Sequence, residues 1–392
     1  MIYVFLFLLL LYGVIRYDVN GNIQNRLYYF YYIVLLLTFV SGLSYRLGAD
    51  TVVYMAEYDE YKSLYNSYCQ NFNFLDEGRQ LGWVLLLSIV KTIGGSFSFL
   101  KLLCSLWINF VYANFIFKHT KYVFTALLLY YFAFYTNSNF EIMRESISIS
   151  FFLLAFDDFL QKKWLKYYLY ATAAFLFHES AIFLFLLPLF SKLNIAKHFI
   201  VYGLIVLFIA FYNFDLNTIL ANLLYIDVKA LDKLEGYLLS ENYGTSNNIS
   251  TIKYLLICIS CVLPLFSFYV LFKNNIRKEY AFFAILYAFI CALMYKMPIF
   301  LRFNNYIIII ILILYVDVFV LISKKIFSAK YIKWAFLFFV LCYCMYKSTY
   351  YMSSTMCPDS VKKYSRYYPY SSIFTKKIDE QRELSHRTNL NR

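Results

Sequence analysis

The stretch Asn304–Ser323, NNYIIIIILILYVDVFVLIS, decides the class of this protein, because Asp317 is its only charged residue. A helix needs ~20 mostly apolar residues to cross the hydrocarbon core of a bilayer, and this stretch has that length. Similar runs recur along the chain of 392 residues, of which 62% are hydrophobic and 15% are charged. A soluble protein of this size could not bury so much apolar surface. The sequence therefore predicts an all-α, polytopic integral membrane protein.

Further apolar runs have the length and composition of membrane spans. They lie near residues 27–45, 98–117, 122–137, 145–160, 199–213, 253–272, 279–297 and 334–351. The run Met1–Ile15 lacks a basic leading segment and a cleavage site of small residues, so it predicts an anchoring helix rather than a cleaved signal peptide. With partial segments included, we expect about 10–12 transmembrane helices in a single transmembrane domain, residues 1–392.

Basic residues predict the orientation of these spans, since short basic loops stay in the cytoplasm. They cluster at 118–121, 162–166, 192–197, 273–278 and 324–333. This pattern places the loops at about 46–97 and 214–252, and the tail at about 353–392, on the outer side. The formal net charge of +13 therefore reflects membrane orientation and does not indicate nucleic-acid binding.

Two segments do not have the form of ordinary spans. Leu81–Ile93 is short and contains Lys91, which predicts a helix that lies at the outer surface or dips into it. Tyr167–Phe190 is flanked by lysines at both ends, so a single crossing would invert every later span. Two half-helices that meet at His178–Glu179 would keep the orientation. We favour this re-entrant or broken segment, which is stable at membrane depth only inside protein or along a cavity.

Charged residues at span ends are the candidate functional residues, because charge is costly at membrane depth. Arg46 and Asp50 follow the span 27–45 and are four residues apart, so on a helical turn they share a face. Such a pair is either an interfacial salt bridge or an arginine that the carboxylate orients toward a phosphate, which arginine binds with two hydrogen bonds.

A second charged group lies at the external mouth of the span 145–160. Glu141, Arg144 and Glu145 have the spacing of a self-neutralised helix end. The alternative is functional, because an arginine that enters the hydrocarbon normally faces a bundle interior or a wet cavity on a substrate path.

His178 interrupts an apolar stretch and precedes Glu179. A lone histidine is often structural, but histidine is also the usual general base near neutral pH, and Glu179 could orient its imidazole. Arg302 lies at a predicted outer boundary, where it either extends to the interface as a cation or binds substrate. Histidines, cysteines and acidic residues do not recur at metal-ligand spacing, and no nucleotide-binding loop is present, so we predict no metal and no cofactor.

These motifs, in this order, resemble a known family, the EpsG-like, Wzy-type polymerases of bacterial O-antigen and exopolysaccharide. The motifs are Arg46-x-Gly48-x-Asp50-x-x-x-Tyr54, the acidic group around Arg144, and Phe177-His178-x-Ser180-Ala181. The resemblance covers roughly residues 40–190, and beyond them it rests on span number, the loop 214–250 and Tyr367-Tyr-Pro-Tyr. In this family glutamine commonly follows the second arginine, whereas this chain has Glu145.

The resemblance implies transfer of a growing glycan from undecaprenyl diphosphate to a lipid-linked repeat unit. It places the protein in the bacterial cytoplasmic (inner) membrane with its active site facing the periplasm or exterior. The implied partners are the undecaprenyl-diphosphate-linked oligosaccharide and the lipid bilayer, with flippase and chain-length regulator proteins as further candidates and no nucleic acid. The expected catalytic residues are His178, Arg144 and Arg46, and the expected substrate-binding residues are Asp50, Tyr54, Glu141, Glu179 and Arg302.

Other membrane proteins remain alternatives at this stage. A flippase or transporter of lipid-linked saccharides would also use intramembrane arginines, but it would usually show two similar halves, which the sequence lacks. An O-antigen ligase would perform nearly the same chemistry on another acceptor. A polytopic acyltransferase would need a histidine but gives no role to external arginines.

Overall fold

A computed structural model of the chain describes residues 1–65, 79–190, 198–211, 251–274, 280–294, 298–326, 329–353 and 366–390. Among these residues all regular structure is helical, apart from one isolated antiparallel bridge between Ser44 and Ser372. This confirms the predicted all-α class. The predicted loop 214–252 lies almost wholly outside the described residues, as does the first part of the predicted tail.

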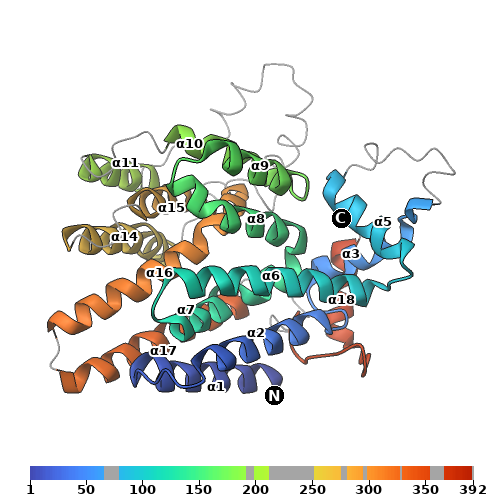
Figure 1. Cartoon of the computed structure of the whole chain (residues 1–392), viewed down its shortest axis with the longest axis horizontal. Coiled ribbons are helices and arrows are strands. Elements are labelled where there is room, and N and C mark those ends of the chain that lie inside the picture. The colour runs from blue at the N-terminus through green and yellow to red at the C-terminus, as the bar shows by residue number, and fades with distance from the viewer. Residues whose placement is uncertain are drawn as a thin grey trace. The chain divides into compact units, whose positions relative to one another are not determined.

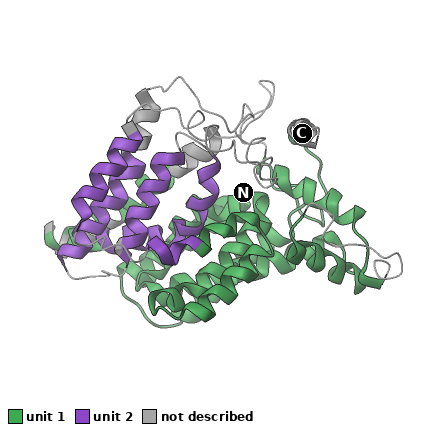
Figure 2. Ribbon diagram, turned by 90° about the horizontal axis from the view of Figure 1, so that it is seen from above, with its two compact units in different colours: residues 1–185, 319–392 green, residues 186–318 purple. Residues whose placement is uncertain are grey.

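The chain divides into two compact units (Figure 2). Unit 1 comprises Met1–Phe185 and Phe319–Arg392, and unit 2 comprises Leu186–Val318. The helices of unit 1 are α1 (Ile2–Gly13), α2 (Arg26–Gly42), α3 (Ala49–Glu60), α5 (Leu81–Thr92), α6 (Phe97–His119), α7 (Val123–Tyr130), α8 (Met143–Leu160), α9 (Trp164–Phe175), α17 (Ala329–Ser353) and α18 (Glu380–Leu390). The helices of unit 2 are α11 (Phe199–Phe211), α14 (Thr251–Lys273) and α15 (Ala281–Met294), and α10 (Ile182–Phe190) and α16 (Leu301–Ile326) run across the boundary.

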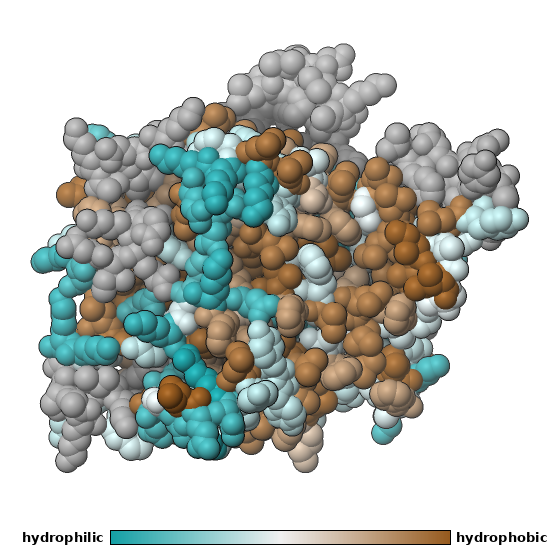
Figure 3. Space-filling view, in the orientation of Figure 1, coloured by the Kyte–Doolittle hydropathy of each residue, from teal (hydrophilic) through white to brown (hydrophobic). Residues whose placement is uncertain are grey.

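The apolar helices agree with the predicted spans. Three helical stretches of the described chain, Ile2–Val19, Phe97–His119 and Leu301–Lys325, are long and apolar enough to cross a membrane, and shorter apolar helices fill other predicted spans. Large apolar side chains remain exposed, such as Leu8 at 55% and Ile200 at 75%, and apolar residues cover broad areas of the face shown in Figure 3. Such surface requires a lipid environment. The chain is a polytopic membrane protein.

The turns that continue α7 contain a buried polar cluster. These turns, Tyr131–Tyr135 and Asn137–Glu141, are wound as π-helix, which is rare and often marks a functional region. Asn139 lies fully buried at its centre, where its amide nitrogen donates to the Tyr135 carbonyl at 3.0 Å and to Ser138 Oγ at 3.0 Å. Asn109 of α6 donates to Asn139 Oδ1 at 2.9 Å. These bonds satisfy buried amides and fix the turn that ends at Glu141.

The segment 167–190 is a broken hairpin, as predicted. α9 ends at Phe175 and α10 begins at Ile182, and the two half-helices pack together through a hydrogen bond from the Tyr167 hydroxyl to the Leu184 carbonyl at 2.7 Å. At the break, the Leu176 carbonyl accepts from the backbone N–H of Gly82 at 2.7 Å. This bond satisfies a carbonyl that the end of α9 leaves unpaired. The predicted short helix near residue 81 is also present, as α5, and its first turn is fixed to the break.

The C-terminal residues fold back on the turn that joins α2 to α3. We name the segment Arg366–Ile373 the tail strap. The Tyr45 N–H donates to the Ser371 carbonyl at 2.9 Å, and the Ile373 N–H donates to the Leu43 carbonyl at 2.9 Å. The helices α3, α5 and α18 gather at one end of unit 1 (Figure 1). That end carries most of the predicted functional residues.

Gly48 occupies a position that only glycine fits. Its φ is 85°, in the left-handed region that L side chains rarely adopt. A Cβ at this residue would lie 2.3 Å from the Phe140 carbonyl oxygen, so the turn before α3 lies directly against the end of the π-helical turn. The Gly48 N–H also donates to the Arg366 carbonyl of the tail strap at 3.2 Å.

We predict that Gly48→Ala destabilises the protein more than Gly21→Ala does. Both positions have positive φ, which costs an alanine ~1–2 kcal/mol, but no atom of a described residue lies within 4 Å of a Cβ at Gly21. The backbone clash at Gly48 adds roughly 1–3 kcal/mol. Thermal unfolding of the purified proteins in detergent measures the difference. Equal melting temperatures for the two variants would show that the turn can move away from Phe140 without loss.

Candidate functional site

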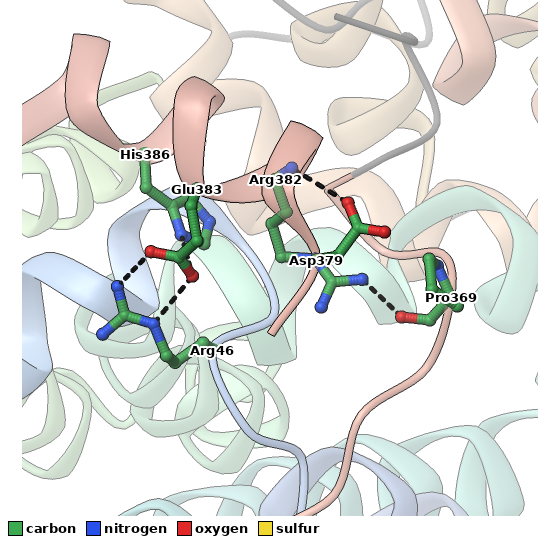
Figure 4. A network of polar contacts seen from close by, with 6 residues as sticks. All are labelled: Arg46, Pro369, Asp379, Arg382, Glu383 and His386. Atoms are coloured by element: carbon green, nitrogen blue, oxygen red, sulfur yellow. Dashed lines mark hydrogen bonds and ion pairs between the residues drawn. The ribbon is translucent and has the colours of Figure 1, made fainter. Parts of the chain in front are cut away.

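Arg46 forms a fork-shaped ion pair with Glu383 of α18 (Figure 4). Its Nε and Nη2 donate to the two carboxylate oxygens at 2.9 and 2.6 Å. Two parallel hydrogen bonds between charged groups are the strongest form of this contact. They raise the pKa of Arg46 and lower the pKa of Glu383, so both groups stay ionised at neutral pH.

Asp50 is not the carboxylate that holds Arg46, contrary to the prediction from their spacing. The two residues do not share a helical turn, because Arg46 has a φ of 49° and α3 begins only at Ala49. Asp50 is exposed in the first turn of α3, and its backbone N–H donates to Glu141 Oε2 at 3.2 Å.

Glu141 ties three segments together. It is 6% exposed, and its carboxylate accepts from the Asp50 N–H and from the Tyr367 hydroxyl, the latter at 3.0 Å. The Arg366 guanidinium lies 3.6 Å from Oε1. A buried carboxylate needs such partners, because an isolated buried charge is very costly. The π-helical turn, α3 and the tail strap are therefore held at one carboxylate.

Arg144 lies at the start of α8 and is 9% exposed. Its Nη1 donates to Gln80 Oε1 at 3.0 Å, and its guanidinium carbon lies 5.6 Å from the centre of the Tyr54 ring, a cation–π distance. Burial raises the pKa of Tyr54, so its phenol stays neutral. The Nε of Arg144 is buried and has no hydrogen-bond partner in the described part of the chain. An oxygen of a ligand would satisfy this donor.

His178 caps the short helical turn Glu179–Ala181. Its Nδ1 accepts from the Ser180 N–H at 3.2 Å and lies 2.7 Å from Ser180 Oγ. Because the backbone amide is a donor, the proton of the neutral ring is assigned to Nε2. Ser180, rather than the predicted Glu179, thus contacts Nδ1 of the His178 imidazole. Glu179 instead accepts from Gln80 Nε2 at 3.4 Å.

Gln80 links two of the predicted residues, since one amide contacts both Arg144 and Glu179. Sequence reasoning missed it, because an uncharged residue in a loop carries no signal of its own. Lys101 was missed as well, since it falls within an apolar span. It is 1% exposed, donates to Ser44 Oγ at 2.8 Å and lies 5.5 Å from the centre of the Phe140 ring.

Five of the seven predicted site residues of unit 1 form two groups, while Arg46 contacts Glu383 and His178 contacts Ser180. Glu141 connects with Asp50, and Arg144 connects with Tyr54 and, through Gln80, with Glu179. Arg302 lies at the start of α16 in unit 2, so its substrate-binding role stays a prediction. Within the described residues, no group of three or more His, Cys, Asp or Glu could hold a metal ion.

The family model for the EpsG family matches residues 27–372. The chain belongs to the EpsG family. Membership supports a polysaccharide polymerase-type function in general terms. The matched region includes the segments that carry Arg46, Arg144 and His178. The match ends within the tail strap, so α18 with Glu383 lies beyond it. Searches of curated proteins and of solved structures return no match for this EpsG-family chain.

His386 adds a titrating group next to the Arg46–Glu383 pair. Its ring is 1% exposed, and Nδ1 lies 3.7 Å from Glu383 Oε1. The pKa of His386 is lowered to about 4, first of all by burial; Glu383 raises it, and Arg46, Arg382 and Arg366 lower it. The imidazole is therefore neutral while α18 is docked at neutral pH.

We predict that acid weakens docking of the tail. Between pH 6.5 and about 4, an undocked His386 binds a proton that the docked residue excludes, so docking loses free energy as pH falls. Glu383, with its lowered pKa, adds to this loss below its ordinary value of 4.5. Hydrogen exchange of the Tyr45 and Ile373 amides measures docking, since both donate across the tail contact. After correction for intrinsic rates, protection should be lower at pH 5 than at pH 7.5.

The control for this experiment is His386→Leu, which fills the buried position without a titrating group. Its protection should change less between the two pH values. Equal protection of the wild-type protein at pH 5 and pH 7.5 would contradict the assignment of a buried neutral imidazole.

Proposed function

We propose that this EpsG-family protein is a polysaccharide polymerase that transfers a growing glycan from undecaprenyl diphosphate to a lipid-linked repeat unit. The reaction would take place at the outer face of the cytoplasmic membrane. One observation carries the proposal: two arginines, Arg46 and Arg144, are held by neighbouring side chains while each keeps hydrogen-bond donors that other described residues do not occupy. Such donors suit the oxygens of a lipid diphosphate.

The arginines suit the donor half of the reaction. The bond from the anomeric carbon of the glycan to the diphosphate oxygen breaks, and the diphosphate leaves with the electron pair. Preorganised charged donors stabilise negative charge where it develops in the transition state. Arg46 lies in the turn before α3, and Tyr54, whose ring contacts the Arg144 guanidinium, lies in the second turn of that helix, so both cations lie next to α3.

The acceptor half needs a base, because a sugar hydroxyl is a weak nucleophile. Its oxygen bonds to the anomeric carbon while its proton passes to the base. His178 is the candidate from sequence, but with Nδ1 held by Ser180 the proton of its neutral ring lies on Nε2. We therefore assign His178 the role of hydrogen-bond donor to substrate oxygen, and we assign proton acceptance to the exposed carboxylate of Asp50.

Deletion of the gene tests the reaction type. Loss of a polymerase leaves single repeat units at the cell surface, so gel analysis of surface glycans should show short chains only. Loss of a flippase would leave no repeat units at the surface, and loss of a ligase would leave polymer that is not transferred to its final acceptor. Either pattern would contradict the proposal.

Complementation with Arg144→Lys should restore protein but little polymer, because an ammonium cannot reproduce the planar fork of donors.

Substitution of His178 separates its two candidate roles. His178→Gln keeps a hydrogen-bond donor but cannot act as a base near neutral pH, so we expect it to retain part of the polymer that His178→Ala loses. Polymer length on gels, at matched protein levels, is the measurement. Complete inactivity of the Gln variant would instead make His178 the general base.

A further inference from the structure

Arg46 presents two different edges of its guanidinium group. Glu383 occupies the Nε–Nη2 edge with both carboxylate oxygens. A guanidinium has five N–H donors, so the Nη1–Nη2 edge can still hold a second oxyanion with two hydrogen bonds. Nη1 makes no hydrogen bond to any described residue, and the side chain is 24% exposed. One edge of Arg46 is thus fixed by the protein, while the other has donors that no described residue occupies.

The backbone around Arg46 is fixed as firmly as the side chain. Arg46 has a positive φ of 49°, which is uncommon for a residue other than glycine. The tail strap holds both sides of this turn, through the N–H of Tyr45 on one side and the N–H of Gly48 on the other. α18 then continues from the strap region and brings Glu383 to the guanidinium (Figure 4). The C-terminal residues therefore determine both the position and the orientation of Arg46.

We propose that Glu383 is a positioning residue of the polymerase, and that the C-terminal segment is part of its donor site. The Glu383 carboxylate orients Arg46 so that the Nη1–Nη2 edge faces a phosphate oxygen of the lipid diphosphate. This inference rests on the proposed function, because it needs a diphosphate at Arg46. The carboxylate that orients Arg46 is thus Glu383, 337 residues away in the sequence, and not that of Asp50, its neighbour in the sequence.

In the contrary arrangement, Glu383 blocks the position of the phosphate and must leave before the donor binds. We name this arrangement the plug. The bidentate pair alone fits both arrangements. The second edge favours positioning, because described residues do not occupy its Nη1 donors and a phosphate could bind there without displacing Glu383. The two arrangements predict opposite effects of removing the carboxylate, so one set of variants separates them.

The experiment measures binding of undecaprenyl diphosphate to the purified full-length protein in detergent. Glu383→Gln removes the charge and one oxygen acceptor, so binding should weaken roughly tenfold, the loss of about one charged hydrogen bond. Glu383→Asp, which keeps the carboxylate, should bind more tightly than Glu383→Gln. The matched control is Glu380→Gln, at an exposed residue of the same helix. This substitution makes the same charge change away from Arg46, so the variant should bind undecaprenyl diphosphate as the wild type does.

A charge exchange tests whether the pair is only structural. In the double variant Arg46→Glu with Glu383→Arg, the ion pair can re-form, so hydrogen exchange at Tyr45 and Ile373 should show a docked tail. Binding of undecaprenyl diphosphate and polymer formation should nevertheless be lost, because position 46 now carries a carboxylate that repels phosphate. Recovery of binding and polymer in the double variant would overturn the proposal and leave a structural salt bridge.

Two further results have defined meanings. Tighter binding by Glu383→Gln than by the wild type would overturn positioning in favour of a plug, and unchanged binding would overturn it outright. If the wild-type protein itself does not bind undecaprenyl diphosphate, the proposed function fails, and the positioning role fails with it. Normal wild-type binding with an unaffected Glu383→Gln variant would remove the positioning role alone.

Discussion

The carboxylate of Glu141 is the interaction on which this end of the molecule depends. It is buried, and it accepts hydrogen bonds from the first turn of α3 and from Tyr367 of the tail strap, with Arg366 close by. Removal of one partner of a buried, hydrogen-bonded charge leaves the other uncompensated, which typically costs ~3–5 kcal/mol. Because three segments meet at this group, the turn that carries Arg46 has little freedom to move independently of the tail.

The same arrangement explains how a mostly apolar bundle carries several charges at one end. Arg46 is paired with Glu383, Arg144 is held by Gln80 and Tyr54, and Lys101 donates to Ser44. Each cation has a protein partner, so none depends on bulk water for its stability. The arginines nevertheless keep donors unused by described residues. That combination suits a site that receives an anionic group, such as the lipid diphosphate of the reaction that we propose.

The apolar runs predicted most of the fold, because a membrane helix is specified by length and composition alone. The broken hairpin was predicted as well, since lysines flank the apolar stretch at both ends and a single crossing would have inverted every later span. The site was predicted only in part. Arg46 and Arg144 stood out as costly charges, but their partners Glu383 and Gln80 lie far away in sequence, and no periodicity links residues across such distances. Asp50 was misassigned because helical spacing was assumed, whereas the backbone at Gly48 separates Arg46 from α3.

The most direct test of this account is an experimental structure with undecaprenyl diphosphate bound. We expect a phosphate oxygen within hydrogen-bond distance of the Nη1–Nη2 edge of Arg46, with Glu383 still on the other edge. We also expect the donor to lie close enough for Arg144 Nε to make a hydrogen bond to it. A phosphate in the place of the Glu383 carboxylate with α18 displaced, or a diphosphate bound away from both arginines, would contradict it.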